Sequence, residues 1–351
     1  MRIAIIAITR NGARLGARLK EGFAGSKLFV LNKYIGQGGK SATPFTVELR
    51  DLIKELWPES DGFVFIMATG IVVRLIAPFM EGKECDPAVV VMDDAGKFAI
   101  SLLSGHLGGA NELACRCAFS TGAREVITTA TDANCLPSFD MLAKEEGWVI
   151  DDISRVKALN ALLLDNEEIA VVDPSCRVRP FFHGRGRLAF HETFMDAFKS
   201  GAKGYLFVTN RHLPPQSQST NLLVLRPKNL VLGIGCNSGT YMEEIEEVVS
   251  VNMKRIFLSL KSVRCIATAT AKRGERGLLD FSEKWGISLE FYESNMLNSV
   301  IVPSPLSPHA LEAIGAIGVA EPAALLASGG GSLLLKKVKN GNVTLAIAET
   351  A

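Results

Sequence analysis

Short apolar runs rich in valine, isoleucine and alanine alternate with helical patterns along most of the sequence. The pattern starts at once, because residues 2–8 are typical of a strand, residues 9–12 of a turn and residues 13–23 of a helix. The runs are continuous rather than alternately apolar and polar, which indicates strands covered on both faces. We therefore expect an α/β fold in which mostly parallel sheets carry helices on both faces.

The strength of this alternation varies along the chain and suggests domain boundaries. A chain of 351 residues is too long for one ordinary core, so we expect two to three domains. The pattern weakens after residue 135, and a polar, proline-rich stretch at residues 211–221 precedes a strong new strand at residues 230–234. We predict an N-terminal α/β domain at residues 1–135, a middle α/β segment at 136–226 and a C-terminal α/β domain at 227–351.

Three short motifs predict local structure. Residues 93–96 read Asp-Asp-Ala-Gly between two strand-like runs, which predicts a hairpin, and Asn340-Gly341 predicts a second hairpin with a type I′ turn. Thr240 and Glu243 have the spacing of a capping box, so we expect a helix to start there.

The charge balance and the cysteines exclude several classes of protein. The 38 basic and 37 acidic residues nearly cancel, and this gives no support for a nucleic-acid or anionic-membrane partner. None of the seven cysteines forms a Cys-x-x-Cys pair, so neither a disulfide framework nor a zinc site is indicated. Free thiols and the lack of a signal-peptide pattern lead us to expect a cytoplasmic protein.

The most apolar stretch, residues 63–79, is interrupted by Thr69, Gly70, Arg74 and Pro78. A membrane-spanning helix needs about 20 apolar residues in a row. We therefore interpret the stretch as a buried strand that leads into a buried helix.

The first candidate ligand site is the end of that strand. Thr69 is placed to cap the following helix, Gly70 lets a ligand approach the backbone, and Arg74 lies about one turn further on. The amides at the start of the helix would attract an anion. The alternative is a capped helix with Arg74 on a solvated face.

The second candidate is a glycine-rich turn around His106, one of only five histidines. Backbone amides at such a turn can stabilise an oxyanion while the imidazole moves a proton. The alternative is a helix-cap or core histidine. The neighbours that we predict to bind substrate are Ser104, Gly105, Gly108, Gly109 and Asn111.

The third candidate is a polar cluster after the strand at residues 125–129, with Thr129, Thr131 and Asp132. Ligands of open α/β sheets bind beyond the carboxyl ends of strands, so Asp132 is placed to act as a base or to orient His106. The alternative is an Asx-turn or a helix cap.

The fourth candidate, residues 233–239, resembles the dinucleotide fingerprint G-x-G-x-x-G, but Ser238 replaces the third glycine. No acidic residue follows the next strand, and this disfavours a nicotinamide cofactor. Cys236 has no adjacent histidine, so we do not expect it to be a nucleophile. Gly235 and Asn237 remain candidates for substrate binding.

Taken together, these blocks resemble one family, the cobalt-precorrin-5A hydrolases of anaerobic cobalamin biosynthesis (the CbiG family). GFVFIMATGIVVRLIAPF, DPAVVVMDDAGKFAISLLSGHLGGANELA and VITTATD carry the resemblance over residues 62–132. LVLGIGCNSGTYMEEIE, VAEPAALLASGGGSLLLKK and VTLAIAE extend it to the C-terminal part, whereas the middle is only loosely similar. One departure is IATATAKR at residues 266–273, where a more acidic segment is expected.

The resemblance implies that the chain opens a δ-lactone on a corrinoid substrate and then cleaves a carbon–carbon bond to release acetaldehyde. Cobalt is carried by the substrate, so no cofactor or metal ligand of the protein is expected. We expect His106 as general base, and Asp132 to orient it or to serve as the alternative base. Cationic side chains would hold the substrate carboxylates, and the candidates are Arg74, Lys83, Arg10, Lys272 and Arg273.

Further expectations concern partners and alternatives. We expect a small-molecule corrinoid as substrate, no nucleic acid or membrane partner, and a homodimer or transient contact with other enzymes of the pathway. One alternative is a corrinoid-binding helper without catalytic activity, and another is an unrelated nicotinamide enzyme.

Overall fold

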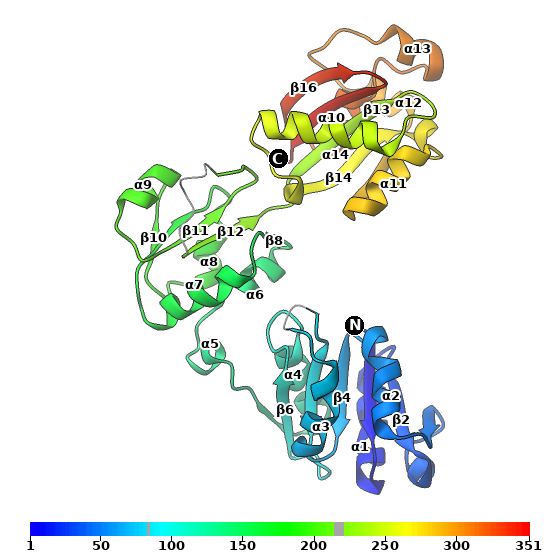
Figure 1. Ribbon diagram of the computed structural model, residues 1–351, viewed down its shortest axis with the longest axis vertical. Helices are drawn as coiled ribbons and strands as arrows, with labels where there is room; N and C mark the ends of the chain where they lie inside the picture. The colour runs from blue at the N-terminus through cyan, green and yellow to red at the C-terminus, as the bar shows by residue number, and fades with distance from the viewer. Residues whose placement is uncertain (83–84, 214–220) are drawn as a thin grey trace. The chain divides into compact units, whose positions relative to one another are not determined.

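The computed structural model describes residues 1–82, 85–213 and 221–351 (Figure 1). The chain folds into two compact units, Met1–Met141 and Leu142–Ala351. Within the described residues, the first unit contains one seven-stranded sheet and the second contains two five-stranded sheets. The predicted α/β class with mostly parallel sheets is confirmed. The boundaries predicted at residues 135 and 226 stay predictions.

The sheet of the first unit has the strand order β3-β2-β1-β4-β5-β6-β7. Neighbours are parallel throughout except for β5 and β6, which form the hairpin predicted at residues 93–96. The strands are β1 (Ile3–Ala7), β2 (Lys27–Leu31), β3 (Ala42–Phe45), β4 (Gly62–Ile66), β5 (Ala88–Met92), β6 (Phe98–Leu103) and β7 (Arg124–Val126).

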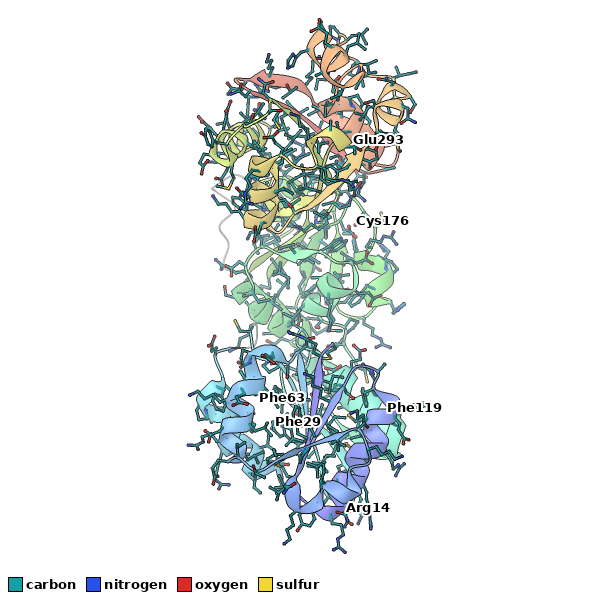
Figure 2. All side chains as sticks on the ribbon, turned by 90° about the vertical axis from the view of Figure 1, so that its right-hand side faces the viewer. Arg14, Phe29, Phe63, Phe119, Cys176 and Glu293 are labelled. Carbon is teal, nitrogen blue, oxygen red and sulfur yellow. The ribbon has the colours of Figure 1, made fainter. Side chains whose placement is uncertain are left out.

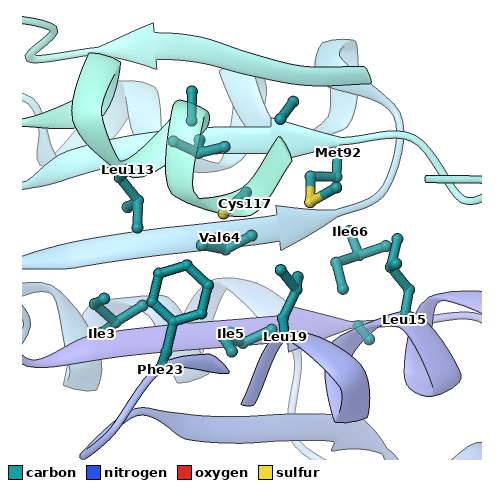
Figure 3. Packing of buried hydrophobic residues seen from close by; sticks show 14 of the residues in the cluster. Ile3, Ile5, Leu15, Leu19, Phe23, Val64, Ile66, Met92, Leu113 and Cys117 are labelled. Atoms are coloured by element: carbon teal, nitrogen blue, oxygen red, sulfur yellow. The ribbon is translucent and has the colours of Figure 1, made fainter. Parts of the chain in front are cut away.

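Helices cover both faces of this sheet because alternate residues of its buried strands point to opposite sides. Ile3 and Ile5 pack with α1 (Arg10–Gly22) and α4 (Ala110–Thr121), as Figure 3 shows around Leu19 and Leu113. Their neighbours in β1, Ala4 and Ile6, pack on the other side with α2 (Leu49–Leu56) and α3 (Thr69–Ile76). Both faces are therefore apolar, as the continuous apolar runs predicted.

The β5–β6 hairpin reverses the direction of the chain. Met92 at the end of β5 pairs with Ala99 near the start of β6, and Val89 near the start of β5 pairs with Leu103 at the end of β6. Because β7 runs parallel to β6, both of these strands end at the edge of the sheet where β4 and β5 begin. This edge is called the reversed edge below.

The first sheet of the second unit has the order β10-β9-β11-β12-β8, and only β12 and β8 are antiparallel. Its strands are β8 (Val149–Ile150), β9 (Ile169–Val172), β10 (Leu188–Phe190), β11 (Gly204–Val208) and β12 (Leu222–Arg226). Helix α5 (Ala130–Ala133) belongs to the first unit, and α6 (Phe139–Glu145) spans the boundary between the units. The helices that follow are α7 (Ser154–Leu164), α8 (Val178–Phe182) and α9 (Phe194–Lys199).

The second sheet of this unit has the order β15-β14-β13-β17-β16, with β13, β14 and β15 parallel and β16 and β17 antiparallel to their neighbours. Helices α10 and α11 pack on one face and α14 on the other. The elements are β13 (Leu230–Cys236), α10 (Met242–Arg255), β14 (Val263–Ala269), α11 (Arg276–Trp285), β15 (Ser288–Tyr292), α12 (Ser294–Asn298), α13 (Pro308–Ile314), α14 (Ala320–Ala327), β16 (Ser332–Asn340) and β17 (Val343–Glu349).

Two predictions of local structure are wrong in detail. The hairpin of β16 and β17 is confirmed, but Asn340 pairs with Val343, and only Gly341 has a positive φ, of 55°. A type I′ turn needs positive φ at both central residues, so the turn is of another type. The predicted capping box is also wrong, because α10 begins at Met242 and the Thr240 hydroxyl donates to the Asn237 carbonyl oxygen instead.

The apolar stretch at residues 63–79 forms the buried strand β4, the helix α3 and a short 3-10 turn, η3 (Ala77–Phe79). The predicted burial of the helix is wrong, because Ile71 and Val73 of α3 are 41% and 46% exposed. Phe63 is fully buried in β4, whereas Phe119 on the outer face of α4 is 94% exposed (Figure 2). Among the described residues, no helix is both long enough and apolar enough to span a bilayer.

Candidate active site

A tight loop between β6 and α4 presents His106. Ser104 has a φ of 56°, and a side chain at Gly108 would place its Cβ 2.4 Å from the Ser104 Cβ. Gly109, with a φ of 89°, forms the N-cap of α4. Glycine is therefore required at both positions, because a bulkier residue would clash at the first and be strained at the second.

The imidazole of His106 lies between two carboxylates. Its Nε2 is 2.7 Å from Asp132 Oδ2, and its Nδ1 is 3.3 Å from Asp140 Oδ2. The Thr131 hydroxyl is 3.2 Å from Nε2. The side chains of His106, Asp132 and Asp140 are 17%, 42% and 9% exposed, so the ring has a buried carboxylate on one side and a solvated one on the other.

This arrangement changes the acidity of the histidine. The hydrogen bond to Asp140 is the largest cause of a raised pKa for His106, and Asp132 raises this pKa further. Burial of the ring opposes both effects. The carboxylates prevail, so the protonated form of His106 persists to a higher pH than in a solvated histidine.

Three donors converge on one oxygen of Asp132. Oδ2 accepts from His106, from Asn111 Nδ2 at 3.0 Å and from the Thr129 hydroxyl. Asn111 is itself held by the Ser101 hydroxyl, which donates to its Oδ1 at 2.6 Å. Within the described residues, Oδ1 of Asp132 accepts no hydrogen bond, and the side chain is 42% exposed.

Ser104 contributes strain rather than a contact to this network. Its hydroxyl is buried and has no hydrogen-bond partner among the described residues. Its carbonyl oxygen accepts from the Ala110 amide at 3.1 Å, and that of Gly105 accepts from the Asn111 amide at 3.0 Å. The loop is thus fixed to the start of α4 through its backbone.

Thr69, Gly70 and Arg74 do not join this cluster. They follow the end of β4, and β4 ends at the edge of the sheet opposite to the reversed edge that carries His106. Thr69 is not the cap of α3 either, because Ala68 is the N-cap residue and no side chain caps the helix. Arg74 is exposed and donates from Nη1 to the Gly70 carbonyl oxygen at 3.0 Å. The structure therefore does not bring the first candidate site together with the second and third.

Gly235 and Asn237 lie in the second unit, where they line a cavity of about 660 Å³ at the carboxyl ends of β13 and β14. A smaller cavity of about 440 Å³ in the first unit is lined by Asp61, Glu81 and Asp86, among others. Neither of these two cavities includes His106.

The first turn of α10 is in close contact with α11. A Cβ at Gly277 would lie 2.2 Å from the Thr240 carbonyl oxygen and 3.0 Å from the Met242 amide nitrogen, so α11 packs against the first turn of α10. Gly233 is needed for packing, because a Cβ there would lie 1.9 Å from the Ala320 carbonyl oxygen of α14. Burial raises the pKa of the Cys236 thiol to about 11, which keeps it protonated at neutral pH.

Comparison with known proteins identifies the family of this chain. Three family profiles match in succession: cobalamin synthesis G N-terminal at residues 51–132, the cobalamin biosynthesis central region at 137–227 and cobalamin synthesis G C-terminus at 230–348. A relative from Priestia megaterium, named cobalt-precorrin-5A hydrolase, is 36% identical over 98% of this chain and 94% of its own length. The chain belongs to the cobalamin synthesis G family.

A second relative, from Salmonella typhimurium, is also named cobalt-precorrin-5A hydrolase. It is 29% identical and covers 98% of this chain and 97% of its own length. The resemblance to the CbiG family that the sequence motifs carry is thus confirmed, over the middle of the chain as well as at both ends.

The cluster around His106 spans two of the matched regions of the cobalamin synthesis G family. His106 and Asp132 lie in the N-terminal region, and Asp140 lies in the central one. Asp140 is the residue that sequence reasoning missed. It lies in the first turn of α6, eight positions after Asp132, and a helix start with an acidic first turn was the only available signal.

The other cations named from the sequence are dispersed in this family member. Arg10 is exposed at the start of α1, and Lys272 lines the cavity of the second unit. Arg273 stacks over the Phe291 ring at 5.2 Å, and Lys83 lies outside the described residues. Among the described residues, no group of three or more His, Cys, Asp or Glu side chains is arranged to hold a metal ion.

Proposed function

We propose that the protein is a cobalt-precorrin-5A hydrolase of anaerobic cobalamin biosynthesis that acts in the cytoplasm. The observation that carries this proposal is the 36% identity to the Priestia megaterium relative of that name, over 98% of this chain. The match extends over nearly the full length of both units. The cobalt enters with the substrate, and we propose no resident cofactor.

The reaction has two steps that need proton transfers. Water adds to the lactone carbonyl, the ring oxygen leaves the tetrahedral intermediate, and a carboxylate and a hydroxyl group result. Loss of the hydroxyl proton then drives cleavage of the adjacent carbon–carbon bond, which releases acetaldehyde and leaves an electron pair on the conjugated macrocycle, where it is protonated. Both steps need a base that accepts a proton and an acid that returns it.

The His106 cluster offers both roles. We assign Asp132 as the base, through Oδ1, because its other oxygen is occupied by three donors. We assign His106 as the proton donor, because its raised pKa favours the imidazolium form. This reverses the first assignment from sequence, in which His106 was the base, and adopts the second, in which Asp132 was.

Asp140 acts through His106 rather than on the substrate. It is 9% exposed and contacts Nδ1, the ring nitrogen that faces away from Asp132. A buried carboxylate at this position fixes the orientation of the ring and stabilises its positive charge.

Purified protein incubated with cobalt-precorrin-5A under anaerobic conditions should release acetaldehyde, measured by coupled oxidation of NADH with alcohol dehydrogenase. Corrinoid binding without acetaldehyde would contradict the proposal and favour a non-catalytic helper. A pH profile separates the two assignments of base and acid. Activity that falls as the pH rises through the pKa of His106 supports His106 as the acid, and activity that rises there would make it the base.

A further inference from the structure

The cavity of the C-terminal part of the second unit is not used by the chemistry described above. It has a volume of about 660 Å³, within the range of about 300–1,000 Å³ that small-molecule sites commonly have. It lies at the carboxyl ends of the parallel strands β13 and β14, the place where open α/β sheets bind ligands.

The wall of this cavity is apolar. Val302, Ala310, Ala313, Ile314 and Val319 contribute, mostly from the segment between α12 and α14. The surface suits the hydrocarbon skeleton of an organic ligand, since burial of apolar area favours binding.

Three cations line the cavity. They are Lys272, Lys337 and Lys339. Lys272 is only 17% exposed and is 3.6 Å from Glu275, and Lys337 donates to the Pro305 carbonyl oxygen at 2.8 Å. Within the described parts of the chain, Lys339 forms no ion pair.

One carboxylate, Glu321, lines the cavity with these lysines. Glu321 is 2% exposed, and its oxygens accept from the Ser304 hydroxyl at 2.7 Å and from the Lys337 amide at 2.8 Å. These bonds tie the segment before α13 to β16. Glu275, at 3.6 Å from Lys272, and Glu321 offset two of the three lysine charges, so the lining keeps an excess of one positive charge, which favours an anion.

We propose that this cavity binds a carboxylate-bearing edge of the corrinoid substrate, with Lys272 and Lys339 on the carboxylates and the apolar wall against the ring. The inference rests on the proposed function and assigns the cavity to the holding of substrate rather than to proton transfer. It gives the C-terminal region of the family a task that the His106 cluster does not perform.

Two corrinoids test the proposal by calorimetric titration of the full chain. Dicyanocobyrinic acid has free carboxylates, whereas dicyanocobinamide has the same macrocycle with amides in their place. We expect the acid to bind at least about tenfold more tightly, because each charge-assisted hydrogen bond contributes more than a neutral one. Equal affinity for the two compounds would overturn the proposal.

Variants locate the binding. We expect Lys272→Gln combined with Lys339→Gln to weaken dicyanocobyrinic acid about 10- to 100-fold, and Ala313→Trp to block the cavity. The matched control is Lys336→Gln, on the same strand but outside the cavity lining, which should bind as the wild type does. An unchanged affinity in the double variant, or an equal loss in the control, would refute the assignment.

Activity separates this inference from the proposed function. If the cavity holds substrate, the lysine variants raise the KM for cobalt-precorrin-5A and leave kcat nearly unchanged. If the wild type releases acetaldehyde and the lysine variants keep its KM, the assignment of the cavity to substrate binding is wrong and the hydrolase function stands. Absence of acetaldehyde release from the wild type would refute the hydrolase function, whatever the corrinoid titrations give.

Discussion

The His106 cluster and the C-terminal cavity are built on opposite principles. The cluster is a network of hydrogen-bonded titratable groups with an exposed carboxylate oxygen, and neither described cavity includes it. The cavity has volume, an apolar wall and cations, but its one lining carboxylate is buried and hydrogen-bonded. The difference suits the two proposals, in which the cluster transfers protons and the cavity holds substrate.

The largest effect should come from the cluster. We expect His106→Ala to lower kcat for acetaldehyde release about a thousandfold, since general acid–base catalysis typically contributes about 10²- to 10⁴-fold. Its affinity for dicyanocobyrinic acid should stay at the wild-type value. Thr128→Ala, an exposed neighbour outside the network, is the control and should retain activity. A near-normal kcat of the His106→Ala protein would contradict the assignment of proton transfer to the cluster.

The next effect concerns the carboxylate that shapes the cavity. Glu321→Ala removes the acceptor for the Ser304 hydroxyl and the Lys337 amide, so we expect a loss of about 2–3 kcal/mol in the free energy of unfolding. Urea unfolding measures this, and dicyanocobyrinic acid should bind more weakly. Glu312→Ala, at an exposed position of α13, should stay within about 0.5 kcal/mol of the wild type. Equal stabilities of the two variants would contradict the role of Glu321.

A smaller effect is expected from Asp140→Asn. Removing the carboxylate that contributes most to the raised pKa of His106 should lower that pKa and decrease kcat about tenfold at slightly alkaline pH. The descending limb of the kcat profile should move to lower pH. Glu112→Gln removes an exposed charge from α4 without a contact to His106, and its profile should match the wild type. If both variants shift the descending limb equally, the pKa of His106 depends on long-range charge and not on the contact with Asp140.

The smallest effect is on the pH dependence of stability. Because the pKa of His106 is raised in the folded state, its contribution to stability is fully present below the unfolded pKa of about 6.5 and is lost as the pH rises through the folded value. The stability difference between the wild type and His106→Gln should therefore shrink from pH 5.5 to pH 9. Urea midpoints across this range check it, and a difference that grows with pH would show that the pKa is lowered.

The fold was largely predictable because its signals are local and repeated. The apolar runs gave β1, β4 and β5, and the Asp-Asp-Ala-Gly turn gave the β5–β6 hairpin. Caps were less predictable. Thr69 and Thr240 have the right chemistry for capping, but the helices begin at Thr69 itself and at Met242, so neither hydroxyl is at the N-cap.

The site was predictable in part. Asp132 was predicted to orient His106, and the structure joins the two by a hydrogen bond. Asn111 and Thr129 were predicted to bind substrate, and their side chains donate to Asp132 instead. The candidate sites were described one by one, and their separation at two edges follows from the β5–β6 hairpin, which turns β6 back. The role of Asp140 could not be predicted from the sequence. Its contact to His106 depends on how the chain folds back after α5, and no local pattern encodes that fold.

The reversal at the β5–β6 hairpin has a consequence for mutational coupling. The start of α3, with Gly70 and Arg74, and the His106 loop lie at opposite ends of five-residue strands. They are about 17 Å apart along the sheet. Substitutions more than about 7–10 Å apart with no shared partners usually have additive free energies. In a double-mutant cycle, the changes that Arg74→Ala and His106→Gln cause in the free energy of unfolding should therefore add. This is expected although both residues belong to the stretch that most clearly resembles the family.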